Sequence, residues 1–148
     1  MNRVNESEGE LKRRRKVAME KIMGAIIESI ERVRKHPLVH SIAFRLLSLY
    51  QSIYMFSLTV KKMGSIVDPL RVKTPSFTVE QVNLLIETYN SIIRDIHSHL
   101  AKKDSYVREF STLESLKEPT VNEVAKTLFI IGINILQILS YITRWMKD

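Results

Sequence analysis

The chain of 148 residues contains no cysteine, and it has only four glycines, four prolines and one tryptophan. The absence of cysteine excludes disulfide bonds, thiolate metal sites and cysteine-based catalysis. The four glycines stand apart from one another, so the sequence has neither a phosphate-binding loop nor a dinucleotide fingerprint. It also lacks a glycine-framed serine nucleophile and the Glu-x-x-His pairs of di-iron bundles. We therefore expect no catalytic residues, no metal, no cofactor and no small-molecule substrate.

The N-terminus and the length indicate the compartment and the number of domains. Residues 1–16 are charged and lack the apolar run that follows the start of a secretory signal, so we expect a cytoplasmic protein. A length of 148 residues fits one domain spanning residues 1–148. Abundant isoleucine combined with many lysine, arginine and glutamate residues is typical of a thermophile-like protein.

One run of 17 residues, between Lys126 and Arg144, carries no charge and is near the lower limit for a membrane-spanning helix. Polar residues recur through this part of the chain at steps of three, four or seven, and on a helix they form one stripe. These residues are Glu123, Lys126, Thr127, Asn134, Gln137, Tyr141, Arg144 and Asp148. A span exposed to lipid needs no such stripe. We interpret the run as the core helix of a soluble bundle, with a membrane span as the alternative.

Apolar residues at helical spacing predict four long helices, at about residues 7–35, 37–63, 78–102 and 120–147. Three of the predicted starts carry capping boxes, in which side chains satisfy the free backbone N–H groups of a first turn. The pairs are Ser7 with Glu10, Thr78 with Gln81, and Thr120 with Glu123. Helices of matched length favour an antiparallel four-helix bundle in up-down-up-down order, so the predicted fold class is all-α.

Two segments separate the predicted helices. Residues 64–77 form a long connection of the kind that is either functional or poorly ordered. Residues 105–118 are ambiguous, because Ser111 and Glu114 have the spacing of a capping box. They predict a possible short helix near residues 111–117.

The net charge of +7 at pH 7 favours binding to nucleic acid, acidic proteins or anionic lipid. In the predicted bundle, the start of the first helix, the 64–77 connection and the C-terminus lie at one pole, which gathers most of the positive charge. The candidate anion- or nucleic-acid-binding residues there are Lys12, Arg13, Arg14, Arg15, Lys16, Lys61, Lys62, Arg71 and Lys73. Such cations release counterions from a phosphate backbone without reading base sequence. The alternative is a solvated helix end, because no aromatic residue lies among residues 12–16 to stack on bases.

A short motif near the end of the third predicted helix adds an enzymatic alternative. The segment IRDIHSHL, from Ile93 to Leu100, contains Arg94-Asp95 and His99 in an Arg-x4-His spacing. It resembles the signature of HEPN-domain ribonucleases, an all-α and often dimeric family in which arginine and histidine act on RNA without metal. The resemblance covers eight residues. It implies that Arg94 stabilises the phosphate and that His99 acts as the general acid–base.

The leading hypothesis rests on surplus apolar surface. The second and fourth predicted helices are apolar over most of their circumference, which is more than a lone four-helix bundle easily hides. We therefore expect a non-enzymatic helical-bundle interaction or scaffold protein, as a homo-oligomer or a subunit of a larger assembly. The alternative functions are a non-specific nucleic-acid-binding subunit that uses the basic pole, and an HEPN-like metal-independent ribonuclease.

Overall fold

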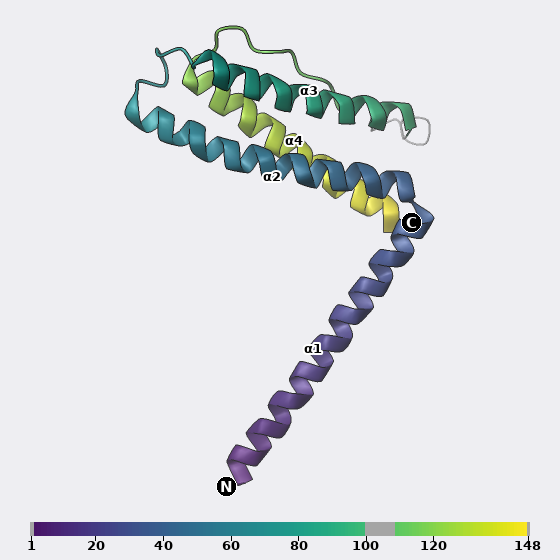
Figure 1. The fold of residues 1–148 in the computed structure, drawn as a ribbon. Helices are drawn as coiled ribbons and strands as arrows, with labels where there is room; N and C mark the ends of the chain where they lie inside the picture. The colour runs from purple at the N-terminus through teal and green to yellow at the C-terminus, as the bar shows by residue number, and fades with distance from the viewer. Residues whose placement is uncertain (1, 100–108, 148) are drawn as a thin grey trace. The chain divides into compact units, whose positions relative to one another are not determined.

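The computed structural model describes the backbone of residues 2–99 and 109–147, with the side chains apart from those of 2–6, 29–30, 32–35 and 144–147. Its helices are α1 (Asn2–Lys35), α2 (Pro37–Ile66), α3 (Ser76–His99) and α4 (Val121–Lys147) (Figure 1). The predicted all-α helical bundle with four long helices is confirmed. The chain divides into two compact units, Met1–His40 and Ser41–Asp148.

The first unit consists mainly of α1, a helix of 34 residues. The capping box predicted at Ser7 does not form, because the helix begins five residues earlier at Asn2. Glu10 instead pairs with Arg13 at 2.8 Å, one turn further along the helix. Large apolar side chains at helical spacing form a stripe along the middle of α1, and each is between 48 % and 61 % exposed. They are Met19, Ile22, Met23, Ile26 and Ile27.

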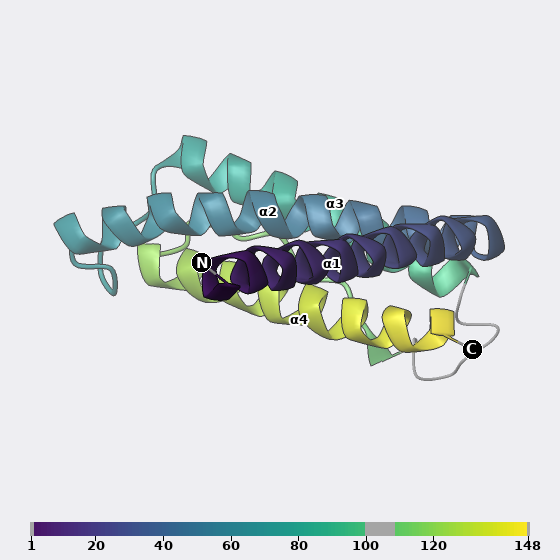
Figure 2. The same ribbon diagram turned by 90° about the horizontal axis from the view of Figure 1, so that it is seen from below.

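The second unit is built around α3, a helix that the spacing of apolar residues predicted and that buries one face. Its buried residues follow one another at steps of three and four. The helix lies beside α2 and α4 in both views (Figures 1 and 2). Isoleucine and valine dominate the core of this unit, and Tyr89 is its largest buried side chain, 1 % exposed. The buried residues of α3 are Val82, Ile86, Tyr89, Ile92, Ile93 and Ile96. The predicted start at Thr78 is two residues late, since α3 begins at Ser76.

The connection between α2 and α3 is ordered, and it completes the start of α4. The backbone N–H of Val121 donates to the carbonyl of Val72 at 3.1 Å, and that of Asn122 donates to the carbonyl of Pro69 at 2.8 Å. The next N–H, of Glu123, donates to the Thr120 hydroxyl at 3.2 Å, which confirms the hydroxyl half of the predicted capping box. Three of the N–H groups that a helix start leaves unsatisfied are therefore bonded.

Residues 111–117 do not form the predicted short helix, because two asparagines of α3 bind their backbone in an extended conformation. Asn90 accepts a hydrogen bond from the N–H of Leu113 at 2.8 Å and donates to its carbonyl at 2.7 Å. Asn83 makes the same pair of bonds with Leu116, at 2.8 and 3.1 Å. Seven helical residues rise about 10.5 Å and three extended residues span about 10 Å, so the two spacings match. We call residues 109–120 the strap.

The strap determines the direction of α4. It runs back along α3 from Leu113 to Leu116, because these residues bond to Asn90 and Asn83 in turn. As a result α4 begins beside the α2–α3 connection and runs parallel to α3 and antiparallel to α2 (Figures 1 and 2). The last helix of the predicted up-down-up-down order therefore has the opposite direction. The C-terminal end of α4 lies away from the connection, so the predicted placement of the C-terminus beside the connection is wrong.

Candidate functional site

The candidate cations of α1 are exposed, but they do not share one face. Residues 12–16 are consecutive, and at about 100° per residue they surround the helix. Glu10 pairs with Arg13 at 2.8 Å and with Arg14 at 3.5 Å, so it neutralises part of this charge. The cluster is a ring of positive charge around one helical segment, without a stacking platform for bases.

The other candidate cations, Lys61, Lys62, Arg71 and Lys73, are exposed near the end of α2 and in the connection that follows it. Arg71 lies 3.7 Å from the carboxylate of Asp68, and this exposed ion pair is weak. These four cations belong to one end of the second unit. Their grouping with residues 12–16 at a common pole stays a prediction.

The two residues of the ribonuclease-like motif point in different directions. Arg94 and His99 are both exposed on α3, and five residues of helix place them about 140° apart around its axis. Their neighbour Asp95 bonds to the guanidinium of Arg45 on α2 at 2.5 Å, which ties the motif to helix packing. Within one copy, the backbone of α3 does not bring the arginine and the histidine onto one phosphate.

The buried hydroxyl of Tyr89 has a structural partner within the second unit. The amide of Asn134 on α4 donates to the Tyr89 hydroxyl on α3 at 3.2 Å, which explains part of the polar stripe predicted on α4. Burial raises the pKa of Tyr89, and the hydrogen bond from Asn134 lowers it by less. In the part of the chain that the structure describes, no three acidic or histidine side chains are grouped so as to hold a metal ion.

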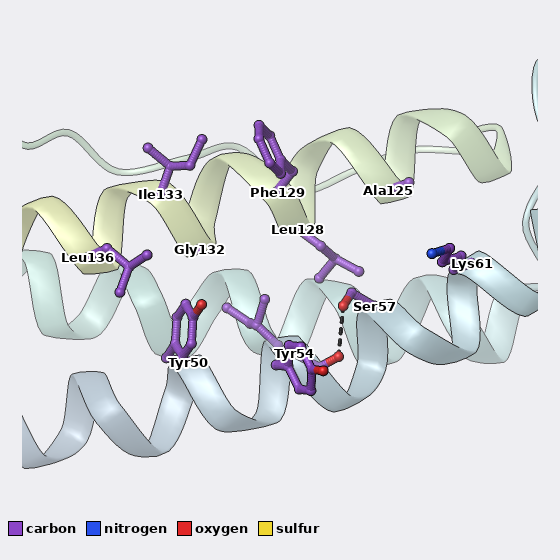
Figure 3. Close-up of a pocket in the computed structure, with 11 residues that line it drawn as sticks. Tyr50, Tyr54, Ser57, Lys61, Ala125, Leu128, Phe129, Gly132, Ile133 and Leu136 are labelled. Carbon is purple, nitrogen blue, oxygen red and sulfur yellow. Dashed lines mark hydrogen bonds between the residues drawn. The ribbon is translucent and has the colours of Figure 1, made fainter.

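The most distinctive surface of the second unit is a groove of about 450 Å³ between α2 and α4 (Figure 3). Tyr50 and Tyr54 come from α2, and Phe129, Ile133 and Leu136 come from α4 on the opposite wall (Figure 3). The remaining lining residues are Ile53, Ser57, Lys61, Ala125, Leu128 and Gly132. Because α2 and α4 are antiparallel, the Tyr50 end of one wall faces the Leu136 end of the other.

The groove is apolar and open to solvent. Phe129 is 67 % exposed and Leu136 is 50 % exposed, although contact with water is unfavourable for both of these apolar side chains. The Ser57 hydroxyl is bonded to the carbonyl of Tyr54 at 2.7 Å, and Lys61 lies at one end of the groove (Figure 3). Gly132 leaves room for a methyl group between the walls, because a Cβ there would make an ordinary van der Waals contact with the Tyr50 ring at 3.8 Å.

Apolar surface continues from the groove around α2. Phe44, Met55 and Leu58 are 68 %, 60 % and 43 % exposed and follow one another at helical spacing. The predicted surplus of apolar surface on the second and fourth helices is therefore present. Soluble monomers rarely expose contiguous apolar patches larger than a few hundred Å². This surface, including the groove, is the strongest candidate functional site in the described chain.

The segment Val121–Thr143 of α4 is long and apolar enough to cross a membrane by length and composition alone. Of its most apolar window, 33 % is buried inside the protein. Core helices of soluble proteins pass the same test, so the finding gives weak evidence for a span.

Lys61 is the one groove residue among the candidate binding residues predicted from the sequence, where it belongs to the basic pole. The aromatic groove residues Tyr50, Tyr54 and Phe129 do not stand out in the sequence, because they have the spacing of ordinary members of apolar helices. The only signal was the width of the apolar face on two helices. Comparison of the chain with protein-family models, with curated proteins and with solved structures finds no match.

Proposed function

We propose that this chain is a non-enzymatic interaction protein that self-associates through the apolar surface around the α2–α4 groove. The observation that supports it most is the open groove with two tyrosines and a phenylalanine on its walls. Aromatic side chains are enriched at the centres of protein interfaces, where they supply large contact areas at low cost in conformational entropy.

The polar groups of the groove favour binding over catalysis. They are two tyrosine hydroxyls, the Ser57 hydroxyl and the amine of Lys61. Among the described residues that line the groove, there is no carboxylate or imidazole to take part in general acid–base chemistry. Exposure of such an apolar wall to water is unfavourable, and burial of the wall against another apolar surface lowers the free energy.

Sedimentation equilibrium of the parent chain and of two matched variants tests the proposal. We expect the parent to associate at tens of micromolar and Phe129→Asp to weaken association by at least about 30-fold, the effect of losing one interface anchor. Phe77→Asp is the matched control, because Phe77 is 71 % exposed but lies at the start of α3 and outside the groove. A monomeric parent, or equal weakening by both variants, would contradict the proposal.

The exposed cations of residues 12–16 support a second candidate, non-specific nucleic-acid binding by α1. We expect labelled single-stranded nucleic acid to bind at low salt and to dissociate steeply as salt rises. The triple variant R13A/R14A/R15A should abolish binding. A control with the same loss of charge, K21A/K117A/K126A, should retain most of it, and equal losses in both would leave only a general charge effect.

A further inference from the structure

We infer that the α2–α4 groove receives the apolar stripe of α1 from a second copy of this chain, so that two copies exchange their first helices. The inference deepens the proposed function and rests on it. It assigns an occupant to the groove, which is a helix of this protein.

The two surfaces are complementary in chemistry. The stripe of α1 presents Met19, Ile22, Met23, Ile26 and Ile27, none of them charged and each close to half exposed or more. An amphipathic helix that lays such a stripe into an apolar groove is a recurring mode of protein recognition. Methionine adapts its shape to irregular gaps, which suits a groove whose walls carry tyrosine, phenylalanine and glycine.

The two surfaces also match in length. From Met19 to Ile27 the stripe rises about 12 Å along its helix. The walls of the groove, from Tyr50 to Lys61 and from Ala125 to Leu136, are each about 17 Å long. The stripe therefore fits within the groove, with room for about three further residues of helix. The ring of cations at residues 12–16 lies beyond the apolar stripe and stays in solvent.

The connection between α1 and α2 favours a second copy as the source of the helix. His36 is the only residue between the two helices, and its carbonyl already accepts the first hydrogen bond of α2, from His40 at 3.0 Å. Two antiparallel helices are joined by two to five residues, as a rule. A one-residue connection hinders reversal of α1 along the α2 of the same copy. Short connections of this kind promote the exchange of an element between copies.

Single-cysteine crosslinking tests the inference directly, because the natural chain contains no cysteine. Ile26→Cys and Phe129→Cys chains are co-expressed with tags of different size and oxidised. We expect a covalent heterodimer as the main crosslinked product. The double variant I26C/F129C should give a covalent dimer. Lys21→Cys is the control for Ile26→Cys, because it lies on the opposite side of α1 and should crosslink at least tenfold less.

Each other product overturns the inference in a recognisable way. An internal crosslink in a monomeric I26C/F129C chain would mean that the helix of the same copy fills the groove. Self-crosslinking of Phe129→Cys would mean that two grooves face each other, which keeps the proposed function and rejects helix exchange. A parent chain that sediments as a monomer and forms no crosslink would reject both.

Discussion

The second unit has two surfaces of opposite character, although the same helices build them. Along α3, the side chains of Asn83 and Asn90 bind the backbone groups of two leucines of the strap through four hydrogen bonds of 2.7 to 3.1 Å. Between α2 and α4, no segment of the second unit that the structure describes covers the groove, and Phe129 stays 67 % exposed. One surface is closed by polar anchors within the chain, and the other is left apolar and open.

Under the proposed function, this difference separates folding from association. Amide side chains have fixed donor and acceptor positions, so they select one backbone segment in one register. An apolar groove has no such directional groups and recognises a partner by shape and buried area. In that proposal, the strap surface serves the folding of the unit and the groove surface serves the binding of a second copy.

The largest expected effect separates the core of α4 from its groove side. Ile135 is 0 % exposed and Ile133 is 39 % exposed, two residues apart on one helix. Ile135→Ala should lower the free energy of unfolding by about 3 kcal/mol at every protein concentration, because it leaves a cavity. Ile133→Ala should cost about 1 kcal/mol in dilute solution and more at high concentration, where association adds to stability. Denaturant titrations at two protein concentrations measure both, and equal losses would remove the distinction.

The asparagine anchors of the strap have the next largest effect. Asn83→Ala and Asn90→Ala should each lower the free energy of unfolding by about 2 kcal/mol, because the backbone groups of Leu116 and Leu113 lose their partners. The double variant should lose less than the sum, since releasing one anchor loosens the other. Gln51→Ala, at an exposed position on α2, is the control and should change stability by less than about 0.5 kcal/mol. A stable double variant would show that the strap is not anchored.

The buried Tyr89 hydroxyl, which accepts a hydrogen bond from Asn134, should make the free energy of unfolding depend on pH. Burial raises the pKa of Tyr89 above its ordinary value of 10.0, so the contribution of the protonated hydroxyl to folding stability is fully present below that pH. It is lost as the pH rises through the pKa of the folded state, because the unfolded chain releases the proton first. Tyr89→Phe should cost about 1 kcal/mol at neutral pH through the lost hydrogen bond. The gap between parent and variant should shrink above pH 10.0, and a gap that stays constant would contradict the assignment.

The smallest expected effect concerns the end of the strap. Glu118 has a φ of 45°, in the left-handed region that favours glycine. Glu118→Gly should raise the free energy of unfolding by about 0.5 kcal/mol, because relief of backbone strain exceeds the added entropy of the unfolded chain. Glu114→Gly is the control, since its φ is not positive, and it should be slightly destabilising. Thermal unfolding resolves the two signs, and a destabilised Glu118→Gly would contradict the expected relief of strain.

The sequence predicted the features that depend on local periodicity. The spacing of apolar residues predicted α3, which buries Val82, Ile86 and Tyr89, and the predicted start of the second helix at residue 37 agrees with α2. The capping signals at Ser7 and Thr78 failed because both helices continue beyond them towards the N-terminus. A capping box is a local signal, and it does not exclude helix on its other side.

The features that depend on distant contacts were not predicted. The strap replaces a helical turn at residues 111–117 because its hydrogen bonds come from Asn83 and Asn90, more than twenty residues away. The direction of α4 follows from the same contacts. Twelve extended residues reach about 40 Å, enough to cross the full length of α3, and the sequence alone did not distinguish that path from a turn. The pairing of the two groove walls depends on the direction of α4, so the groove was not predicted from the sequence either.

Hydrogen exchange of α1 at several protein concentrations tests the central claim most directly, that a second copy covers the apolar surfaces. Helices in proteins gain most of their stability from packing, and none of the α1 side chains that the structure describes is buried. The amides of residues 18–28 should therefore be weakly protected in dilute solution and strongly protected once the chain associates. Phe129→Asp should remove that gain. Protection that is the same at every concentration, in parent and variant alike, would contradict the claim.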